Sequence, residues 1–349
     1  MEVVLLLQNG EGRKSQQDKI RERVSESGFE FAVLELDKGV TEEEPDDMGF
    51  IKQIEEWITE NKKPVATLRW DEHGNVFGKH PKFKKIATWG WENKIAPLNI
   101  DFGYFCHYGS FMFDLLDRNG NTSVKREWAS LDKDLMPMEE FPGKLGDFIR
   151  LVKRIYEKHE YFYSMKHFTA SYRYVVFTQC LANNCKVMRS NDASAWIHNM
   201  NLALGSSALF KIQPAMFNDK KIDLTGFRTV FSGGFPDIIN QSIEQNACLA
   251  VPAEACITNT SAVTSELLIG GKQIITTGES WFSGLGVFHE VDKWDNLEPT
   301  VEQCAGKAVS GKQFEARLKF VNWWRKHQAM HGEKSLIVKD LINYFKQEN

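Results

Sequence analysis

The fold is decided by the segment from Cys256 to Glu290, whose sequence is CITNTSAVTSELLIGGKQIITTGESWFSGLGVFHE. The pattern predicts an apolar strand, a hydroxyl-rich turn and a helix that carries Glu266. The glycine pair at 270–271 ends this helix, and residues 273–277 form a short β-branched strand. The order of strand, turn, helix and strand is typical of a parallel α/β unit.

The turn of this unit carries groups that bind anions. It runs over residues 258–261 and ends in Thr260 and Ser261. The unpaired N–H groups and positive dipole end of a helix start favour a phosphate group there. Glu266, one turn further on, can accept a hydrogen bond from a ribose hydroxyl of the same nucleotide. An ordinary α/β crossover has the same pattern, so the rest of the chain must distinguish the two interpretations.

Two further strand ends carry polar residues. Residues 174–178 (YVVFT) predict a buried strand followed by Gln179. Residues 208–212 (ALFKI) predict another, which carries Lys211 and is followed by Gln213. Ligands in open α/β sheets bind at the carboxyl ends of the strands, so these side chains are expected at one edge of one sheet.

This ordered set resembles the capsular polysaccharide synthesis glycosyltransferases, the family that includes the bacterial Kdo transferases. That family has a Gln after a strand, a Lys-Pro-His-Pro run, a Thr-Ser turn before a helical Glu, and a Gly followed by a Tyr-rich Gly-Leu loop. The matching positions here are Gln179, Lys211 to Pro214, Thr260 with Ser261, Glu266 to Leu268, and Gly278 to Leu285.

The resemblance covers roughly residues 86–290 and has two departures from the family pattern. Gln213 stands where the family has His, and Trp281 with Phe282 stand where it has Tyr. The donor can therefore differ from the CMP-sugar that is usual in the family.

The resemblance implies an α/β protein of the GT-B type, with two Rossmann-like domains, a cleft between them and C-terminal helices that cross back. We expect an acceptor-side domain over residues 1–165 and a nucleotide-sugar-binding domain over 166–325. Residues 326–349 are expected to form a helix that packs on the first domain. A length of 349 residues also favours two domains over one.

The N-terminal half alternates between strand and helix patterns, which favours a parallel sheet. The predicted strands are 3–7, 29–36, 64–70 and 85–89, and the predicted helices are 15–27, 47–60 and 143–159, with terminal helices at 312–331 and 335–346.

The stretch from Trp89 to Asp117 is rich in aromatic and ionisable residues. Aromatic faces stack on sugars or bases, and a carboxylate or histidine can take the proton from an acceptor hydroxyl. Asp101, Glu92 and His107 are therefore the candidate catalytic bases. The alternative is a piece of core that ends in a plain turn at 117–120.

Composition excludes several classes of protein. The net charge of −4 argues against a strongly basic nucleic-acid binder, although Lys79 to Lys85 and Lys312 to Lys326 are local basic patches. Six cysteines without a C-x-x-C pair favour reduced thiols over a zinc site. No run of 18 apolar residues and no signal peptide is found, so a cytoplasmic protein without a transmembrane segment is expected.

The predicted function is metal-independent transfer of a sugar from a CMP- or UDP-linked nucleotide sugar to a hydroxyl of a capsule or surface glycan. No other cofactor and no metal ligand is predicted. The expected donor contacts are Gln179, Lys211, Gln213, Thr260, Ser261, Glu266 and Gly278.

Three alternatives stay open. A phage enzyme that glycosylates a hydroxymethylated pyrimidine in DNA would act in the host cytoplasm, and Trp89, Trp91, Tyr104 and Tyr108 could stack on its extruded base. A protein that binds a sugar or nucleotide without catalysis would not need the acceptor-side carboxylates. An unrelated α/β enzyme is the last alternative.

Overall fold

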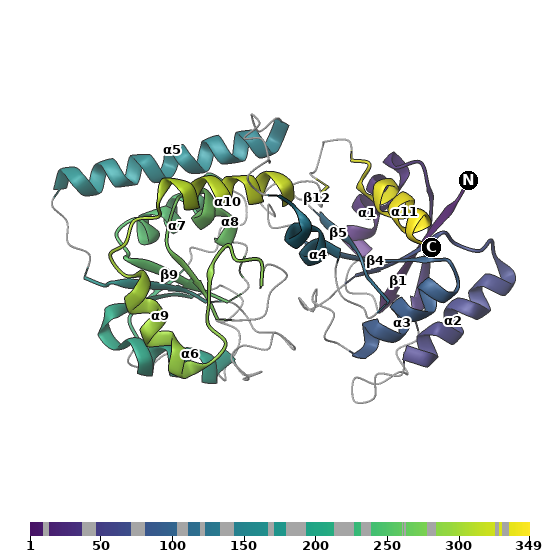
Figure 1. Cartoon of the computed structure of the whole chain (residues 1–349), viewed down its shortest axis with the longest axis horizontal. Coiled ribbons are helices and arrows are strands. Elements are labelled where there is room, and N and C mark those ends of the chain that lie inside the picture. The colour runs from purple at the N-terminus through teal and green to yellow at the C-terminus, as the bar shows by residue number, and fades with distance from the viewer. Residues whose placement is uncertain are drawn as a thin grey trace. The chain divides into compact units, whose positions relative to one another are not determined.

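The structure is a computed structural model, and it describes residues 1–9, 14–36, 47–70, 81–102, 111–118, 123–132, 143–166, 171–178, 193–212, 227–231, 239–259, 261, 263–277, 284–324, 328–329 and 335–349. These residues form two compact units. The first unit comprises Met1–Leu131 with Trp324–Asn349, and the second comprises Asp132–Trp323. Figure 1 shows both units.

The first unit is built on a six-stranded sheet with the order β12-β5-β4-β3-β1-β2. Strands β1 to β4 pair in parallel, whereas β5 and β12 are antiparallel to their neighbours. The strand bounds are β1 Val3–Asn9, β2 Glu30–Leu36, β3 Ala66–Trp70, β4 Ala96–Phe102, β5 Phe111–Leu115 and β12 Gln328–Ala329. The order 2-1-3-4-5 is that of doubly wound flavodoxin-like sheets.

Helices cover both faces of this sheet because successive side chains of a strand point to opposite faces. Leu5 and Leu7 pack with α2 and α3, whereas Val4 and Leu6 pack with α1 and α11. The helix bounds are α1 Lys14–Glu26, α2 Asp47–Glu60, α3 Pro81–Glu92, α4 Ser123–Ser130 and α11 Ile337–Glu348.

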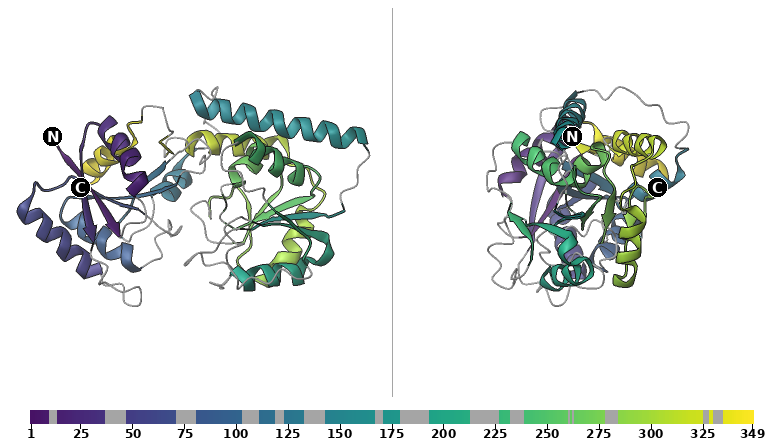
Figure 2. Two further views of the ribbon diagram at one scale, coloured as in Figure 1. Left: turned by 180° about the vertical axis from the view of Figure 1, so that it is seen from behind. Right: turned by 90° about the vertical axis from the view of Figure 1, so that its left-hand side faces the viewer.

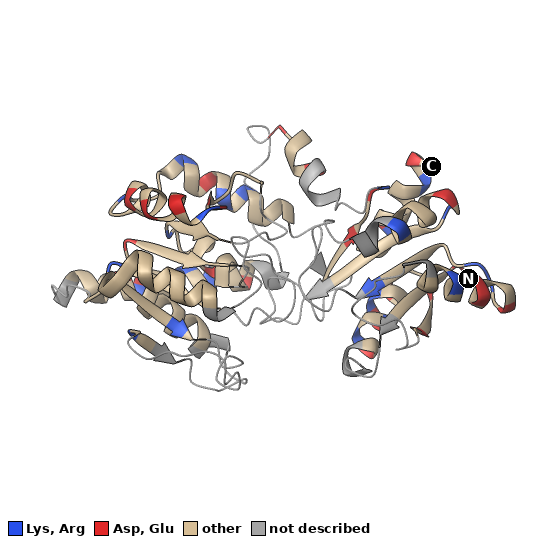
Figure 3. Cartoon of the chain, turned by 90° about the horizontal axis from the view of Figure 1, so that it is seen from below, with Lys and Arg blue, Asp and Glu red and all other residues tan. Residues whose placement is uncertain are grey.

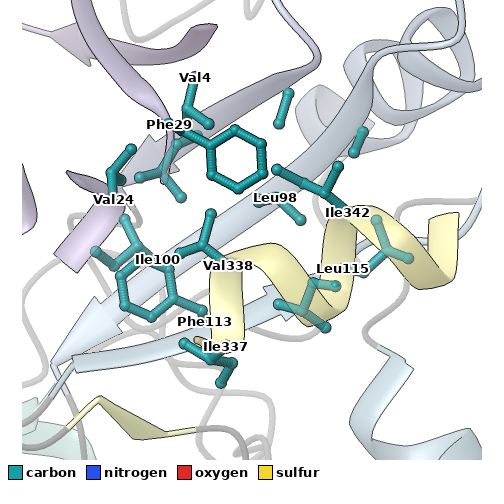
Figure 4. Packing of buried hydrophobic residues seen from close by; sticks show 14 of the residues in the cluster. Val4, Val24, Phe29, Leu98, Ile100, Phe113, Leu115, Ile337, Val338 and Ile342 are labelled. Carbon is teal, nitrogen blue, oxygen red and sulfur yellow. The ribbon is translucent and has the colours of Figure 1, made fainter. Parts of the chain in front are cut away.

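The C-terminal segment returns to the first unit, as predicted. β12 adds an edge strand beside β5, and α11 buries an apolar face against the sheet. Figure 4 shows Ile337, Val338 and Ile342 of α11 beside the strand residues Leu98, Ile100, Phe113 and Leu115. The helix is therefore part of the core of this unit.

The second unit contains a six-stranded sheet in which all five strand pairings are parallel. Its order is β11-β10-β9-β6-β7-β8, which is the 3-2-1-4-5-6 order of a Rossmann sheet. The strand bounds are β6 Tyr174–Phe177, β7 Ala208–Ile212, β8 Thr229–Phe231, β9 Ala255–Thr258, β10 Ile274–Thr276 and β11 His289–Glu290.

Helices flank this sheet on both faces (Figures 1 and 2), with α7, α8 and α10 on one side and α6 and α9 on the other. Helix α5 packs on α7 and α8. The helix bounds are α5 Gly143–Lys166, α6 Ala193–Leu204, α7 Ile239–Ala250, α8 Val263–Ile269, α9 Leu297–Cys304 and α10 Gly311–Trp324, with 3₁₀ turns at Gly205–Ser207 and Trp294–Asn296.

Two secondary-structure predictions are wrong. The helix expected over residues 312–331 ends at Trp324 in α10, and residues 328–329 form the strand β12. Residues 85–89 were expected to form a strand, but they lie within the helix α3. Ile86 and Trp89 are three residues apart, so a helix places both of them in the core beside α2. The predicted domain boundary at residue 165 lies at the end of α5, whereas the contacts of α5 with α7 and α8 place that helix in the second unit.

Candidate functional site

The strand order of the second unit marks a place for a ligand. The order reverses between β6 and β9, and open α/β sheets bind ligands outside the carboxyl ends of the strands at such a point. The last residues of these strands, Phe177 and Thr258, are paired in register, and Phe177 also pairs with Lys211 of β7. Lys211 therefore lies one strand away from the switch point, at the same level of the sheet.

Lys211 and Glu266 are brought together through a residue that sequence reasoning missed. The Lys211 ammonium donates a hydrogen bond to the side-chain oxygen of Asn246 on α7. Asn246 in turn donates its Nδ2 to Glu266 Oε2 over 2.7 Å. Glu266 and Asn246 are 0% and 4% exposed. A cation, an amide and a carboxylate thus form one hydrogen-bonded chain between the sheet, α7 and α8.

Asn246 could have been found from the spacing of α7. Ile243, Ala247 and Ala250 form the buried stripe of that helix. Asn246 is three residues after Ile243 and four before Ala250, so it falls on the same stripe. A carboxamide on an apolar helix face needs buried hydrogen-bond partners.

The environment of Lys211 weakens its hold on a proton. Burial lowers the pKa of Lys211 below its ordinary value of 10.5, and the negative charge of Glu266 opposes this change. The ammonium also lies 5.9 Å from the centre of the Phe177 ring, within the range of a cation–π contact. A half-buried ammonium of this kind gains more from an anionic ligand than a solvated one does.

Tyr156 of α5 lies in the same electrostatic neighbourhood. Burial, then the charge of Glu266, raises the pKa of this phenol well above its ordinary value. Its hydroxyl is buried and has no hydrogen-bond partner among the residues that the structure describes. Tyr156 is therefore a neutral, buried group behind the carboxylate.

Ser261 caps the start of α8, as the sequence predicts. Its Oγ accepts a hydrogen bond from the Val263 backbone N–H at 3.4 Å. Its carbonyl oxygen accepts one from the Thr264 hydroxyl at 2.6 Å and one from the Thr264 N–H at 3.0 Å. The cap orients the helix that carries Glu266.

Further polar groups are buried at the same edge of the sheet. Thr258 pairs with Thr276 in the register of β9 and β10. Both hydroxyls, and the whole side-chain amide of Asn259, are buried without a partner in the described part of the chain. Asn259 is 0% exposed. Such groups carry a desolvation cost that a polar ligand or water can offset.

Glu92 and Asp101, the predicted acceptor-side residues that the structure describes, are not brought together. Glu92 is exposed at the end of α3, just before β4 begins at Ala96. Asp101 is the sixth residue of β4 and pairs with Met112. At about 3.3 Å per residue, Asp101 is roughly 16 Å along the strand from Ala96. Only Asp101 is near the carboxyl end of the strand.

A buried polar row crosses the first sheet near Asp101. Arg69, Asn99 and Asp114 are paired in register across β3, β4 and β5. Asn99 and Asp114 are 3% and 1% exposed, and Arg69 is half-buried. One feature of the sequence indicates this row. Asp114 lies within the apolar run FMFDL, and a carboxylate is rarely buried in such a strand without polar partners.

Several predicted site residues lie outside the described part of the chain. They are His107, Gln179, Gln213, Thr260 and Gly278.

The described residues of the aromatic stretch and of the second basic patch differ from expectation, whereas Tyr104, Tyr108 and Lys79 lie outside the described part of the chain. Trp89 and Trp91, predicted to stack on an extruded base, are core residues whose indole N–H groups bond Glu55 Oε1 at 3.0 Å and the Leu116 carbonyl at 2.9 Å. Trp323 and Arg317 of the second basic patch are also buried. Figure 3 shows acidic and basic residues interspersed on the described ribbons of both units.

Among the described residues, no group of three or more His, Cys, Asp or Glu side chains could hold a metal ion. Within the same part of the chain, no helix combines the length and the apolar character that crossing a membrane requires.

The sequence matches no protein-family model and no curated protein. Three of the 32 solved chains that are similar to this one are the following. The beta Kdo 2,7 transferase of Thermosulfurimonas dismutans KpsC is 11% identical, with a TM-score of 0.50 and full coverage of both chains. Its beta Kdo 2,4 transferase is 12% identical, with a TM-score of 0.47 over 98% of each chain.

A UDP-GlcNAc 2-epimerase of Methanocaldococcus jannaschii is 13% identical, with a TM-score of 0.38 over 93% of this chain and 100% of that one. Of these three, the first has a TM-score that bears on the fold. It agrees with the two Rossmann-like sheets and the returning C-terminal helix. The predicted likeness to the Kdo transferases is thus confirmed for the fold: the chain has the GT-B fold.

Proposed function

We propose that the protein is a glycosyltransferase that moves a sugar from a nucleotide sugar to a hydroxyl of a glycan. The observation that carries this proposal is the convergence of Lys211 and Glu266, linked by Asn246, beside the switch point of a Rossmann sheet. At such an edge, a cation can bind the phosphate of a nucleotide and a carboxylate can bind its ribose.

In the proposed reaction the bond between the anomeric carbon and the phosphate oxygen of the donor breaks. A new bond forms between that carbon and the acceptor oxygen, and the acceptor proton passes to a base. Lys211 offsets the negative charge that develops on the leaving phosphate, and this charge is largest in the transition state. Glu266 accepts a hydrogen bond from ribose, for which its carboxylate, 0% exposed in the structure, has to be uncovered.

We propose that the donor contacts also include Gln179, Gln213, Thr260, Ser261 and Gly278, with a CMP- or UDP-linked sugar as donor. No other cofactor is required, because the charge of Lys211 takes the part that a divalent metal would play. Asp101 is our preferred base over Glu92, since it lies near the carboxyl end of its strand. We place the reaction in the cytoplasm.

The test is a donor and acceptor panel. The wild-type protein is incubated with CMP- and UDP-linked sugars, and released nucleotide is measured with surface glycans, with simple sugars, and with DNA containing 5-hydroxymethylcytosine. Transfer to a glycan supports the proposal. Transfer to the modified DNA alone would replace the glycan by a DNA acceptor, and binding of nucleotides without any turnover would indicate a binding protein.

A further inference from the structure

The link between the two charged groups of the site is an amide. An ammonium group only donates hydrogen bonds and a carboxylate only accepts them. Asn246 meets both needs at once, because its Oδ1 faces Lys211 and its Nδ2 faces Glu266 at 2.7 Å. This chemistry fixes the orientation of the amide.

A direct ion pair between Lys211 and Glu266 would behave differently. A carboxylate in contact with the ammonium would neutralise its charge and compete with a phosphate for its hydrogen atoms. With the amide between them, Lys211 uses one of its three N–H donors on a neutral acceptor. Among the described residues, no other hydrogen-bond acceptor for this ammonium is found.

The charges around Lys211 are few. From α8 it faces Glu266, from α7 the neutral Asn246, and from β6 the ring of Phe177. Tyr156 of α5 is neutral, because burial and the charge of Glu266 raise the pKa of its phenol. Glu266 is thus the ionised group that acts on Lys211 from the elements packed around it, in the part of the chain described.

We propose that Asn246 is a positioning residue that keeps Lys211 charged and available to the phosphate of the donor while it holds Glu266 in place for the ribose. This inference rests on the proposed function. It identifies the ligand group that Lys211 binds as a phosphate. It also predicts that the residue at position 246 sets the pH range over which that phosphate is bound.

Two substitutions at this position are expected to change the pKa of Lys211 in opposite directions. Asn246→Ala removes the hydrogen-bond acceptor of the ammonium, so the pKa of Lys211 falls further. Asn246→Asp places one carboxylate oxygen against the ammonium, so the pKa of Lys211 rises, but the new ion pair competes with phosphate. The other oxygen replaces Nδ2 beside Glu266 Oε2, so one of these two carboxyl groups has to hold a proton between them. A merely structural role of Asn246 would lower thermal stability in both variants without opposite shifts.

The experiment measures calorimetric affinity for CMP and UDP from pH 7.5 to 10.5. In this range the terminal phosphate is already fully ionised and cytosine does not titrate, so the pH dependence of CMP affinity reports on Lys211. Uracil loses its N3 proton within the range, so UDP affinity is compared only at pH 7.5. Both variants should bind about 10-fold more weakly than wild type at pH 7.5, which is the loss of roughly one hydrogen bond to a charged group. The alkaline loss of binding should move to lower pH in Asn246→Ala and to higher pH in Asn246→Asp.

Gln245→Ala, an exposed change on the same helix, is the matched control and should leave affinity and pH profile unchanged. If Asn246→Ala fails to fold, Asn246→Ser replaces it, and if Asn246→Asp fails to fold, the downward shift of Asn246→Ala and Asn246→Ser against wild type is the test. The serine hydroxyl is too short to span both groups, so the shift of Asn246→Ala is expected.

A readout without nucleotide separates this inference from the proposed function. The rate at which an amine-reactive reagent labels Lys211 is followed against pH by peptide mass spectrometry. Opposite shifts of the labelling profile in the two variants support the role of Asn246 even if no nucleotide binds to wild type, an outcome that would overturn the proposed function. Nucleotide binding with unshifted profiles in both variants would overturn the role of Asn246 alone.

Discussion

The ring of Tyr156 lies against the backbone of Gly270, where a Cβ atom would come within 2.4 Å of the ring atoms Cδ1 and Cε1. Gly270 directly follows α8, whereas Tyr156 belongs to α5. The close approach lets the helix that carries Glu266 pack directly on α5. Only glycine fits this contact without movement of the ring.

Gly270→Ala should therefore destabilise the protein. The added methyl overpacks a buried contact, and such changes cost about 1–3 kcal/mol. Urea denaturation measures the loss of unfolding free energy, and a nucleotide-binding assay measures any displacement of Glu266. Gly311→Ala is the control, because a Cβ there has no neighbour within 4 Å. Equal stability of the two variants would contradict the contact.

Tyr156→Phe should keep or increase stability. The Tyr156 hydroxyl is buried without a hydrogen-bond partner among the described residues, and its raised pKa keeps it neutral. Removal of an unpaired buried hydroxyl leaves the ring contact with Gly270 intact and relieves a desolvation cost of about 1 kcal/mol. A fall in the free energy of unfolding would show that the hydroxyl has a partner after all.

The parallel sheet of the second unit could be predicted from the sequence because polar residues lie at or just after the ends of its strands. Lys211 and Glu266 could be placed at one edge from strand order alone, since parallel strands share a carboxyl edge. Asn246 could not be assigned a role in that way. Its partners come from β7 and α8, and only tertiary packing brings them to the same side of α7.

In the N-terminal half, the sequence pattern alone did not determine the structure of residues 85–89 or the role of Trp91. The short apolar run at 85–89 fits a strand or a helix, and the contact of Trp89 with α2 decides for the helix. Trp91 was a plausible stacking residue in sequence, but it packs on Phe345 with ring centroids 4.5 Å apart. Aromatic content does not tell a binding face from a core.

The stability of the second unit should depend on Glu244 at acid pH. A hydrogen bond from Lys158 is the main cause that lowers the pKa of Glu244 below its ordinary value of 4.5. A carboxyl group with a lowered pKa stabilises the fold above the unfolded value, and this contribution is lost as pH falls through the folded value.

Between pH 5 and pH 3, wild type should therefore lose more stability than Glu244→Gln. The side chains are 50% and 40% exposed, so the difference is that of a surface pair, roughly 0.2–1 kcal/mol. Urea titrations at each pH measure it. Glu157→Gln, an exposed change on α5, should follow wild type. Parallel curves for all three proteins would contradict the role of the pair.

Thiol reactivity should distinguish the cysteines of the second unit. Cys248 is exposed, whereas Cys256 and Cys304 are buried. Burial raises the pKa of Cys256 to about 12, although the positive charges of Lys272 and Arg317 act to lower it. Its thiolate is therefore scarce at neutral pH. Alkylation followed by peptide mass spectrometry should modify Cys248 in the native protein and Cys256 only after unfolding. Rapid native labelling of Cys256 would show that β9 opens locally.

Turnover should survive chelation, because the proposed mechanism assigns the phosphate charge to Lys211. EDTA is therefore expected to leave the rate of nucleotide release largely unchanged, whereas Lys211→Ala should weaken nucleotide binding by about 1.5–3 kcal/mol, the range for a hydrogen bond to a charged group. Added magnesium should not restore activity to that variant, since a metal would need its own ligands. Complete loss of wild-type activity in EDTA, with recovery in manganese, would contradict the assignment. Asp132 and Asp134, which have Asp-x-Asp spacing, would then be the first ligands to substitute.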